Sequence, residues 1–158
     1  MVKINVLGLG NVLHTDEGFG VEAVKRLEAA TGFDETVEFI DGGTQGIYLL
    51  DFVTSPDRLL IFDAVIPKES EVKVYLYGGD ELPAFVQQKM SAHQTGLSDL
   101  LSLAKLRGET PEEIVLIGIP PQDLNMHVGL SPEVEAMMPE AVAMGEEVIQ
   151  KWLAEEKA

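Results

Sequence analysis

The sequence predicts an α/β fold, a three-layer α/β/α sandwich around a mostly parallel, twisted sheet of about five strands with one antiparallel edge strand. Three observations predict it. Short apolar runs alternate with helical periodicity over residues 3–62, which is typical of parallel strands joined by right-handed crossovers. The next apolar run follows after a link too short for a parallel return. A last strand leads into a long amphipathic helix, and the 158 residues suit one domain over residues 1–158.

The first half of the chain is predicted to contain three strands and two helices. The strands are almost wholly apolar, as expected for strands buried on both faces, and they are residues 3–7, 36–40 and 58–62. The helices are expected at about residues 18–31 and 45–53. Gly8 and Gly10 are expected to break the first strand. The usual order of such a unit places the first strand between the second and the third.

The second half begins with a strand that we expect to be antiparallel and at an edge. Residues 72–77 alternate apolar and polar side chains, and residues 66–71 are too few for a parallel crossover. A last strand is expected at residues 114–119. The expected helices are a short one at residues 82–89, one with the inner stripe Leu97, Leu100, Leu101 and Ala104, and a long one that Ser131 caps with Pro132 at its first position.

The composition excludes several classes of protein. A net charge of −16 argues against nucleic acid, because nothing offsets the repulsion of the phosphates. No apolar stretch approaches the length of a membrane span, and the first residues predict a strand rather than a signal peptide, so we expect a cytoplasmic protein. The absence of Cys excludes disulfides, a cysteine nucleophile and metal thiolates from this chain.

Three side chains are predicted to meet at one edge of the sheet. Ligands of such sheets bind at the carboxyl ends of the strands, where the strand order reverses. That rule brings Glu17, after the first strand, close to Asp63, after the third, and the chain can return His93 to the same edge. Two carboxylates and an imidazole suit a divalent ion such as nickel, zinc or cobalt. Asp41 follows the second strand, one strand further out.

The residues alone also leave structural roles open for each of these side chains. Glu17 would satisfy the free amides of a first helical turn, and Asp41 would support a turn at Gly42. Asp63 would cap a loop, and His93 would be an ordinary polar loop residue. Dinucleotide binding is disfavoured, because Leu13 stands where the third glycine of that motif belongs. The sequence also has no P-loop lysine, G-x-S-x-G or H-E-x-x-H.

Four fragments together give a specific resemblance: G-L-G-N-V-L-H-T-D-E-G-F-G, I-D-G-G-T, F-D-A-V and S-A-H-Q. The chain resembles the hydrogenase maturation proteases over nearly its whole length, with Ala92 where some relatives are expected to have proline. The resemblance implies that Glu17, Asp63 and His93 bind the metal. It also implies a substrate, the large-subunit precursor of a nickel-iron hydrogenase, which loses its C-terminal extension after nickel insertion. The nickel is then carried by the precursor, and zinc or cadmium are other ions that such a site would accept.

The route of peptide cleavage stays open from the sequence. No serine or cysteine nucleophile suggests itself, so we expect water to attack. Either the shared metal activates it, or Asp41 or Asp16 is the general base, which would be aspartyl protease-like chemistry. A chaperone that senses the metal without cutting, and a nucleotide-binding enzyme, are the alternatives. Candidates for the surface that contacts the partner protein are Phe19, Ile47, Tyr48 and the loop Pro120 to Val128, and a core or simple loop role is equally open for each.

Overall fold

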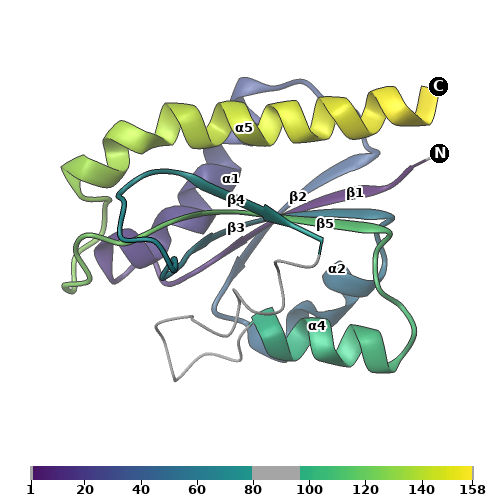
Figure 1. The fold of residues 1–158 in the computed structure, drawn as a ribbon, viewed down its shortest axis with the longest axis horizontal. Helices are drawn as coiled ribbons and strands as arrows, with labels where there is room; N and C mark the ends of the chain where they lie inside the picture. The colour runs from purple at the N-terminus through teal and green to yellow at the C-terminus, as the bar shows by residue number, and fades with distance from the viewer. Residues whose placement is uncertain (1, 80–96, 158) are drawn as a thin grey trace.

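The computed structural model describes residues 2–79 and 97–157. Strands alternate with helices along most of this length, as Figure 1 shows. The strands are β1 (Ile4–Leu9), β2 (Val37–Gly43), β3 (Arg58–Ala64), β4 (Tyr75–Gly78) and β5 (Glu113–Ile119). The helices are α1 (Phe19–Ala30), α2 (Leu50–Thr54), α4 (Leu97–Leu106) and α5 (Pro132–Lys157), with 3-10 turns η1 (Thr15–Gly18) and η2 (Gly46–Leu49).

The sheet has the predicted topology. Its five strands lie in the order β2-β1-β3-β5-β4. β1 pairs in parallel with both β2 and β3, β3 pairs in parallel with β5, and β4 runs antiparallel to β5 at the edge. The predicted position of the first strand between the second and third is therefore confirmed, and so is the antiparallel edge strand.

Helices cover both faces of the sheet, which makes the three predicted layers. In Figure 1, α1 and α5 lie above the sheet and α2 and α4 lie below it. The side chains of β3 divide between the two cores because successive residues of a strand point to opposite faces. Leu60 and Phe62 join the core under α1 and α5, whereas Leu59 and Ile61 join the core against α2 and α4.

Helix boundaries follow the predicted signals where a cap is present. Ser131 accepts a hydrogen bond at its Oγ from the backbone N–H of Val134 at 3.3 Å, so the predicted cap of α5 is confirmed. The predicted helix over residues 45–53 was wrong in its start, because η2 occupies Gly46–Leu49 and α2 begins at Leu50. The helix expected at residues 82–89 lies outside the described residues. No helix in the described part of the chain is long and apolar enough to cross a membrane.

Strand boundaries differ from the prediction in each strand, in β5 only by its start at Glu113. β1 runs through Gly8 and ends at Leu9, so the expectation that Gly8 breaks it was wrong. β2 and β3 extend further than expected, and Asp41 and Asp63 therefore lie inside them. β4 begins only at Tyr75, because the preceding residues do not join β5.

Candidate active site

Two glycines allow the start of α1 to lie on the carboxyl ends of two strands. A Cβ on Gly20 would sit 2.2 Å from the carbonyl oxygen of Phe62 and 2.3 Å from that of Leu9. A Cβ on Gly8 would sit 2.4 Å from the carbonyl oxygen of Gly20. Side chains at these positions would push α1 away from the sheet, so the glycines fix the place where the loop before α1 crosses the edge.

Glu17 and Asp63 lie at the carboxyl edge of the sheet, where the start of α1 contacts β1 and β3. Glu17 belongs to η1, immediately before α1, and η1 contacts β3. Asp63 follows Phe62 in β3 and stands opposite Gly118 of β5. Both acids are buried, with 7% of Glu17 and 1% of Asp63 exposed. The structure therefore brings to one sheet edge two of the three side chains expected there.

His93, the third expected side chain, lies outside the described residues. Within residues 2–79 and 97–157, no group of three or more His, Cys, Asp or Glu side chains could hold a metal ion. The metal-binding set of Glu17, Asp63 and His93 therefore stays a prediction.

Asp41 lies at the same end of the sheet, one strand further out. It pairs with Gly8 of β1 in the register of β2, which adjoins β1 on the side away from β3. Its side chain is exposed, in contrast to Glu17 and Asp63. An exposed carboxylate is accessible to a water molecule, as a general base must be.

Asp16 has a different environment from Asp41. It is fully buried, and its carboxylate accepts four hydrogen bonds. Oδ2 accepts from the backbone N–H of Gln122 at 2.8 Å, from that of Asp123 at 2.9 Å and from the hydroxyl of Ser131 at 2.8 Å. Oδ1 accepts from the backbone N–H of Ser131 at 2.8 Å. This arrangement favours a structural role, in which Asp16 fastens the loop before α5 to η1.

The backbone continues this attachment between residues 11–16 and 122–131. The N–H of Thr15 donates to the carbonyl of His127, and the N–H of His127 donates to the carbonyl of Leu13, each at 2.9 Å. Thr15 has φ = 47°, which is unusual for a residue other than glycine, and its hydroxyl donates to the carbonyl of Asn125 at 2.6 Å. These bonds hold the segment that leads into Glu17.

The residues expected to contact a partner protein have different exposures. Phe19 is fully buried and lies edge-to-face against Phe62, so of the two roles left open for it, surface or core, the structure shows core. The side chain of Ile47 lies outside what the structure describes. Tyr48 is 82% exposed, and Leu124, Met126 and Val128 are exposed on the expected loop.

One ion pair joins α1 to α5 beside the attachment between residues 11–16 and 122–131. Arg26 donates from two guanidinium nitrogens to the two carboxylate oxygens of Glu135, at 3.0 and 2.6 Å, and from Nε to Glu22 at 3.0 Å. The hydrogen bond from Arg26 lowers the pKa of Glu135 below its ordinary value of 4.5. The same bond raises the pKa of Arg26, so both groups are charged at neutral pH.

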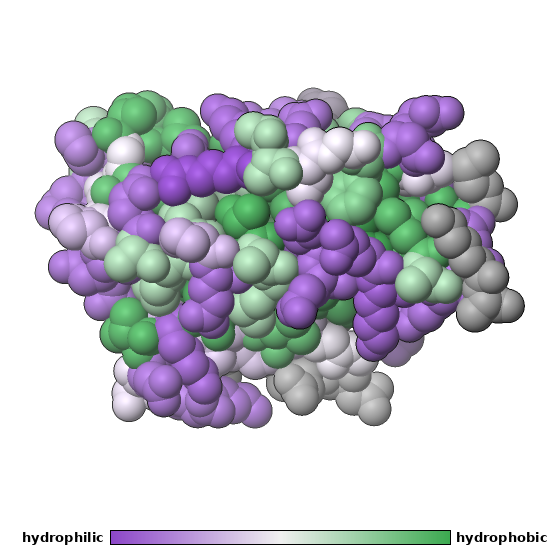
Figure 2. Space-filling view, turned by 90° about the horizontal axis from the view of Figure 1, so that it is seen from above, coloured by the Kyte–Doolittle hydropathy of each residue, from purple (hydrophilic) through white to green (hydrophobic). Residues whose placement is uncertain are grey.

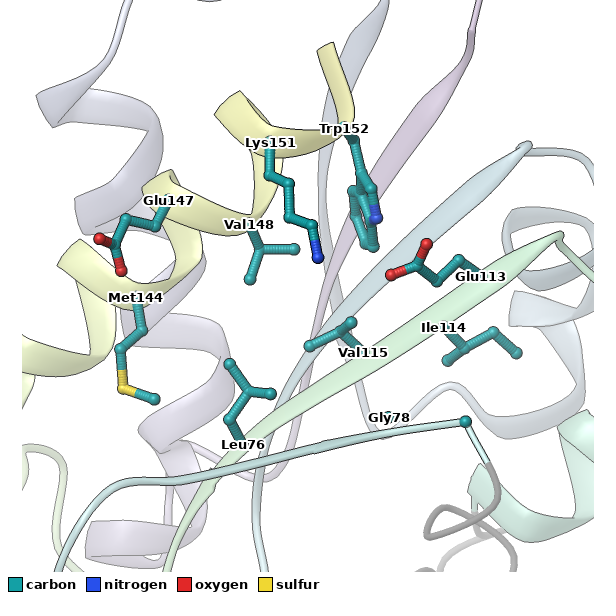
Figure 3. Close-up of a pocket in the computed structure, with 11 residues that line it drawn as sticks. Leu76, Gly78, Glu113, Ile114, Val115, Met144, Glu147, Val148, Lys151 and Trp152 are labelled. Carbon is teal, nitrogen blue, oxygen red and sulfur yellow. The ribbon is translucent and has the colours of Figure 1, made fainter. Parts of the chain in front are cut away.

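A separate cavity lies between α5 and the strands β4 and β5, as Figure 3 shows. It has a volume of about 690 Å³, and its lining includes Leu76, Glu113, Met144, Lys151 and Trp152. Glu113 is the first residue of β5, whereas ligands of parallel sheets bind at the carboxyl ends of the strands. On the outer side of α5, hydrophilic side chains surround smaller hydrophobic areas (Figure 2).

The comparisons with known proteins agree on one family. A sequence model described as hydrogenase maturation protease matches residues 21–148. The hydrogenase 2 maturation protease of Escherichia coli (strain K12) is 41% identical over 142 residues, which cover 89% of this chain and 87% of that protein. The hydrogenase expression/formation protein HupD of Rhizobium leguminosarum bv. viciae is 41% identical over 152 residues, which cover 95% of this chain and 75% of that protein.

Solved structures have the same fold. The hydrogenase maturating endopeptidase HybD from E. coli matches with a TM-score of 0.88 and 39% identity, over 94% of this chain and 93% of that one. The [NiFe] hydrogenase maturation protease HybD from Thermococcus kodakarensis matches with a TM-score of 0.75 and 26% identity, over 92% and 98% of the two chains. The family match and these relatives identify an enzyme that hydrolyses peptide bonds: the chain belongs to the hydrogenase maturation protease family.

Proposed function

We propose that this protein removes the C-terminal extension of the large-subunit precursor of a nickel-iron hydrogenase after nickel has been inserted, and that it recognises the nickel. Membership of the hydrogenase maturation protease family supports the protein substrate. The observation that carries the nickel-dependent part is the location of two buried acids, Glu17 and Asp63, at the carboxyl edge of the sheet. Carboxylate oxygens are among the ligands that divalent ions such as nickel accept, so two acids at this edge suit a nickel ion that arrives with the substrate.

The donor set fits a nickel ion that belongs to the precursor. Glu17, Asp63 and His93 would contribute two carboxylates and one imidazole, which are ligands that nickel accepts. The chain contains no Cys, so any thiolate ligand would come from the precursor itself. A bound nickel ion would supply positive charge that polarises a nearby carbonyl group. The same set would accept zinc or cadmium.

Asp41 is the general base that we favour. Its exposed carboxylate at the same end of the sheet is accessible to the water molecule that would attack the peptide bond. Asp16, the other candidate, is fully buried and occupied by four hydrogen bonds. We therefore assign the proton transfer to Asp41. The location of the protein in the cytoplasm stays a prediction from the sequence.

The proposal is tested by incubating the purified protein with nickel-loaded and nickel-free precursor and measuring the product masses. The expected result is a loss of the C-terminal mass from the loaded precursor only. Asp63→Asn should abolish that loss, whereas Asp51→Asn, at an exposed acid of α2, should leave it unchanged. Cleavage of nickel-free precursor at the same rate would refute nickel recognition. Binding of loaded precursor without a mass change would show a chaperone instead. A protein that neither binds nor cuts the precursor but is stabilised against unfolding by a nucleotide would be a nucleotide-binding enzyme.

A further inference from the structure

Large apolar side chains are exposed where residues 11–16 and 122–131 are attached, beside the exposed polar residues Asn125 and His127. Five large hydrophobic side chains are exposed there, two from the loop before η1 and three from the loop before α5; we call them the apolar ridge, and they are Val12, Leu13, Leu124, Met126 and Val128. Met126 is 80% exposed and Val128 is 67% exposed. Contiguous apolar side chains in water are unfavourable, and on soluble domains such groups mark interaction surfaces.

The ridge is held in a fixed frame. The backbone of Leu13 and Thr15 is bonded to His127, and the side chains of Thr15 and Asp16 are bonded to the opposite loop. These bonds place the two groups of apolar side chains next to each other. A preformed surface of this kind loses little conformational entropy when a partner binds.

A hollow of about 240 Å³ opens beside the ridge, and Val12 and Val128 both line it. The opposite lining comes from α1 and α5 and includes the ion pair of Arg26 with Glu135. Arg26 already binds two carboxylates, and the exposed Lys25 adds a further positive charge to the lining of the hollow. Its size and its valines suit one apolar side chain, which would act as an anchor in the manner of an interface hot spot.

We propose that the apolar ridge is the docking surface for an apolar segment of the precursor protein, next to the bond that is cut. This inference rests on the proposed function. Continuity with the site favours this occupant: Leu13 lies four residues before Glu17 in one bonded segment, so the ridge adjoins the segment that carries the proposed nickel ligand. A second copy of this chain is the alternative occupant that the experiment distinguishes.

The test compares the double variant Leu13→Ser/Met126→Ser with the control Leu106→Ser. Leu106 is 83% exposed at the end of α4, so the control removes a similar apolar side chain away from the ridge. With nickel-loaded precursor, the ridge variant should raise KM about tenfold or more and leave kcat at saturation unchanged, and the control should change neither. An unchanged KM in the ridge variant overturns the proposal.

Two further readouts separate this inference from the proposed function. If the wild-type protein binds loaded precursor but does not cut it, the protease function fails, and about tenfold weaker capture by the ridge variant still supports docking. Equal capture of the precursor by both proteins overturns docking, and so does an absence of capture by the wild-type protein. Light scattering measures the mass of each protein. If the wild type is a dimer, the ridge variant is a monomer and KM is unchanged, the ridge serves self-association and the proposal is overturned.

Discussion

Ser131 donates two hydrogen bonds to Asp16, one from its backbone N–H and one from its hydroxyl, each at 2.8 Å, although 115 residues separate the two in the chain. The same hydroxyl accepts the N–H of Val134 as the cap of α5. A single buried carboxylate therefore joins the loop before Glu17 to the start of the longest helix.

Asp16→Asn should destabilise the protein by about 3 kcal/mol or more. An amide keeps one acceptor oxygen and turns an NH₂ group toward donors that the carboxylate now satisfies. Urea unfolding measures the loss, and Asp51→Asn, at an exposed acid, should change stability by less than about 0.5 kcal/mol. A variant that unfolds like the wild type but has lost its turnover would instead make Asp16 the base.

Gly10→Ala should destabilise the protein far more than Gly108→Ala. Both glycines have positive φ, 134° at Gly10 and 68° at Gly108. A Cβ on Gly10 would sit 1.8 Å from the carbonyl oxygen of Glu17, whereas nothing lies within 4 Å of one on Gly108. The control should lose about 1 kcal/mol for backbone strain alone, and Gly10→Ala several times as much, in thermal or urea unfolding. Equal losses would show that the loop moves aside freely.

Asp41→Asn should lower kcat for cleavage of loaded precursor by about 10²-fold to 10⁴-fold. The amide is nearly isosteric but cannot accept the proton of the attacking water. Because Asp41 is exposed, the free energy of unfolding should stay within about 0.5 kcal/mol of the wild type. Rates at saturating precursor, with Asp51→Asn as the control, measure the effect, and undiminished turnover would remove Asp41 from the chemistry.

The pair of Arg26 and Glu135 should make a small part of the stability depend on pH. The lowered pKa of Glu135 means that its contribution is present above the pKa of an unfolded glutamate and is lost as pH falls through the lower, folded value. Glu135→Gln should cost less than about 1 kcal/mol near neutral pH, because both side chains are more than a third exposed.

The cost of Glu135→Gln should disappear in acid, once the pH has fallen below the lowered, folded pKa of Glu135. Urea unfolding across this range measures the difference, with Glu140→Gln on the exposed side of α5 as the control. A cost that persists unchanged in acid would mean that packing, rather than charge, holds α1 against α5 at this point.

The sheet order and the edge that carries the site were predictable because they follow from local patterns. Alternating apolar strands and helices imply parallel pairing, and parallel strands direct their carboxyl ends to one edge. Glu17 and Asp63 follow the first and third apolar runs, so their common location needed no long-range information.

The role of Gly8 was not predictable in the same way. A glycine after an apolar run normally indicates a turn, but Gly8 remains in β1 because its missing side chain admits the backbone of Gly20. Close packing between a strand and the helix that follows it requires glycine, and so does a tight turn. The pattern alone therefore could not separate the two causes.

The attachment between residues 11–16 and 122–131 left no signal that the sequence could supply. Its hydrogen bonds join single residues of irregular backbone, so they produce neither a helical nor a strand period. An acid before a helix, such as Asp16, is an ordinary feature of a first turn. Only the folded chain shows that Gln122, Asp123 and Ser131 surround it.

The bond between Asp16 and Ser131 also sets an order of events during synthesis. The loop before Glu17 leaves the ribosome early, but its donors come from residues 122–131, near the end of the chain. A nascent chain therefore lacks the donors that hold residues 11–16 until residues 122–131 have been made, so an incomplete protein should not cut its target. Limited proteolysis of a chain stopped at residue 120 should cleave residues 11–16, which the full-length protein protects.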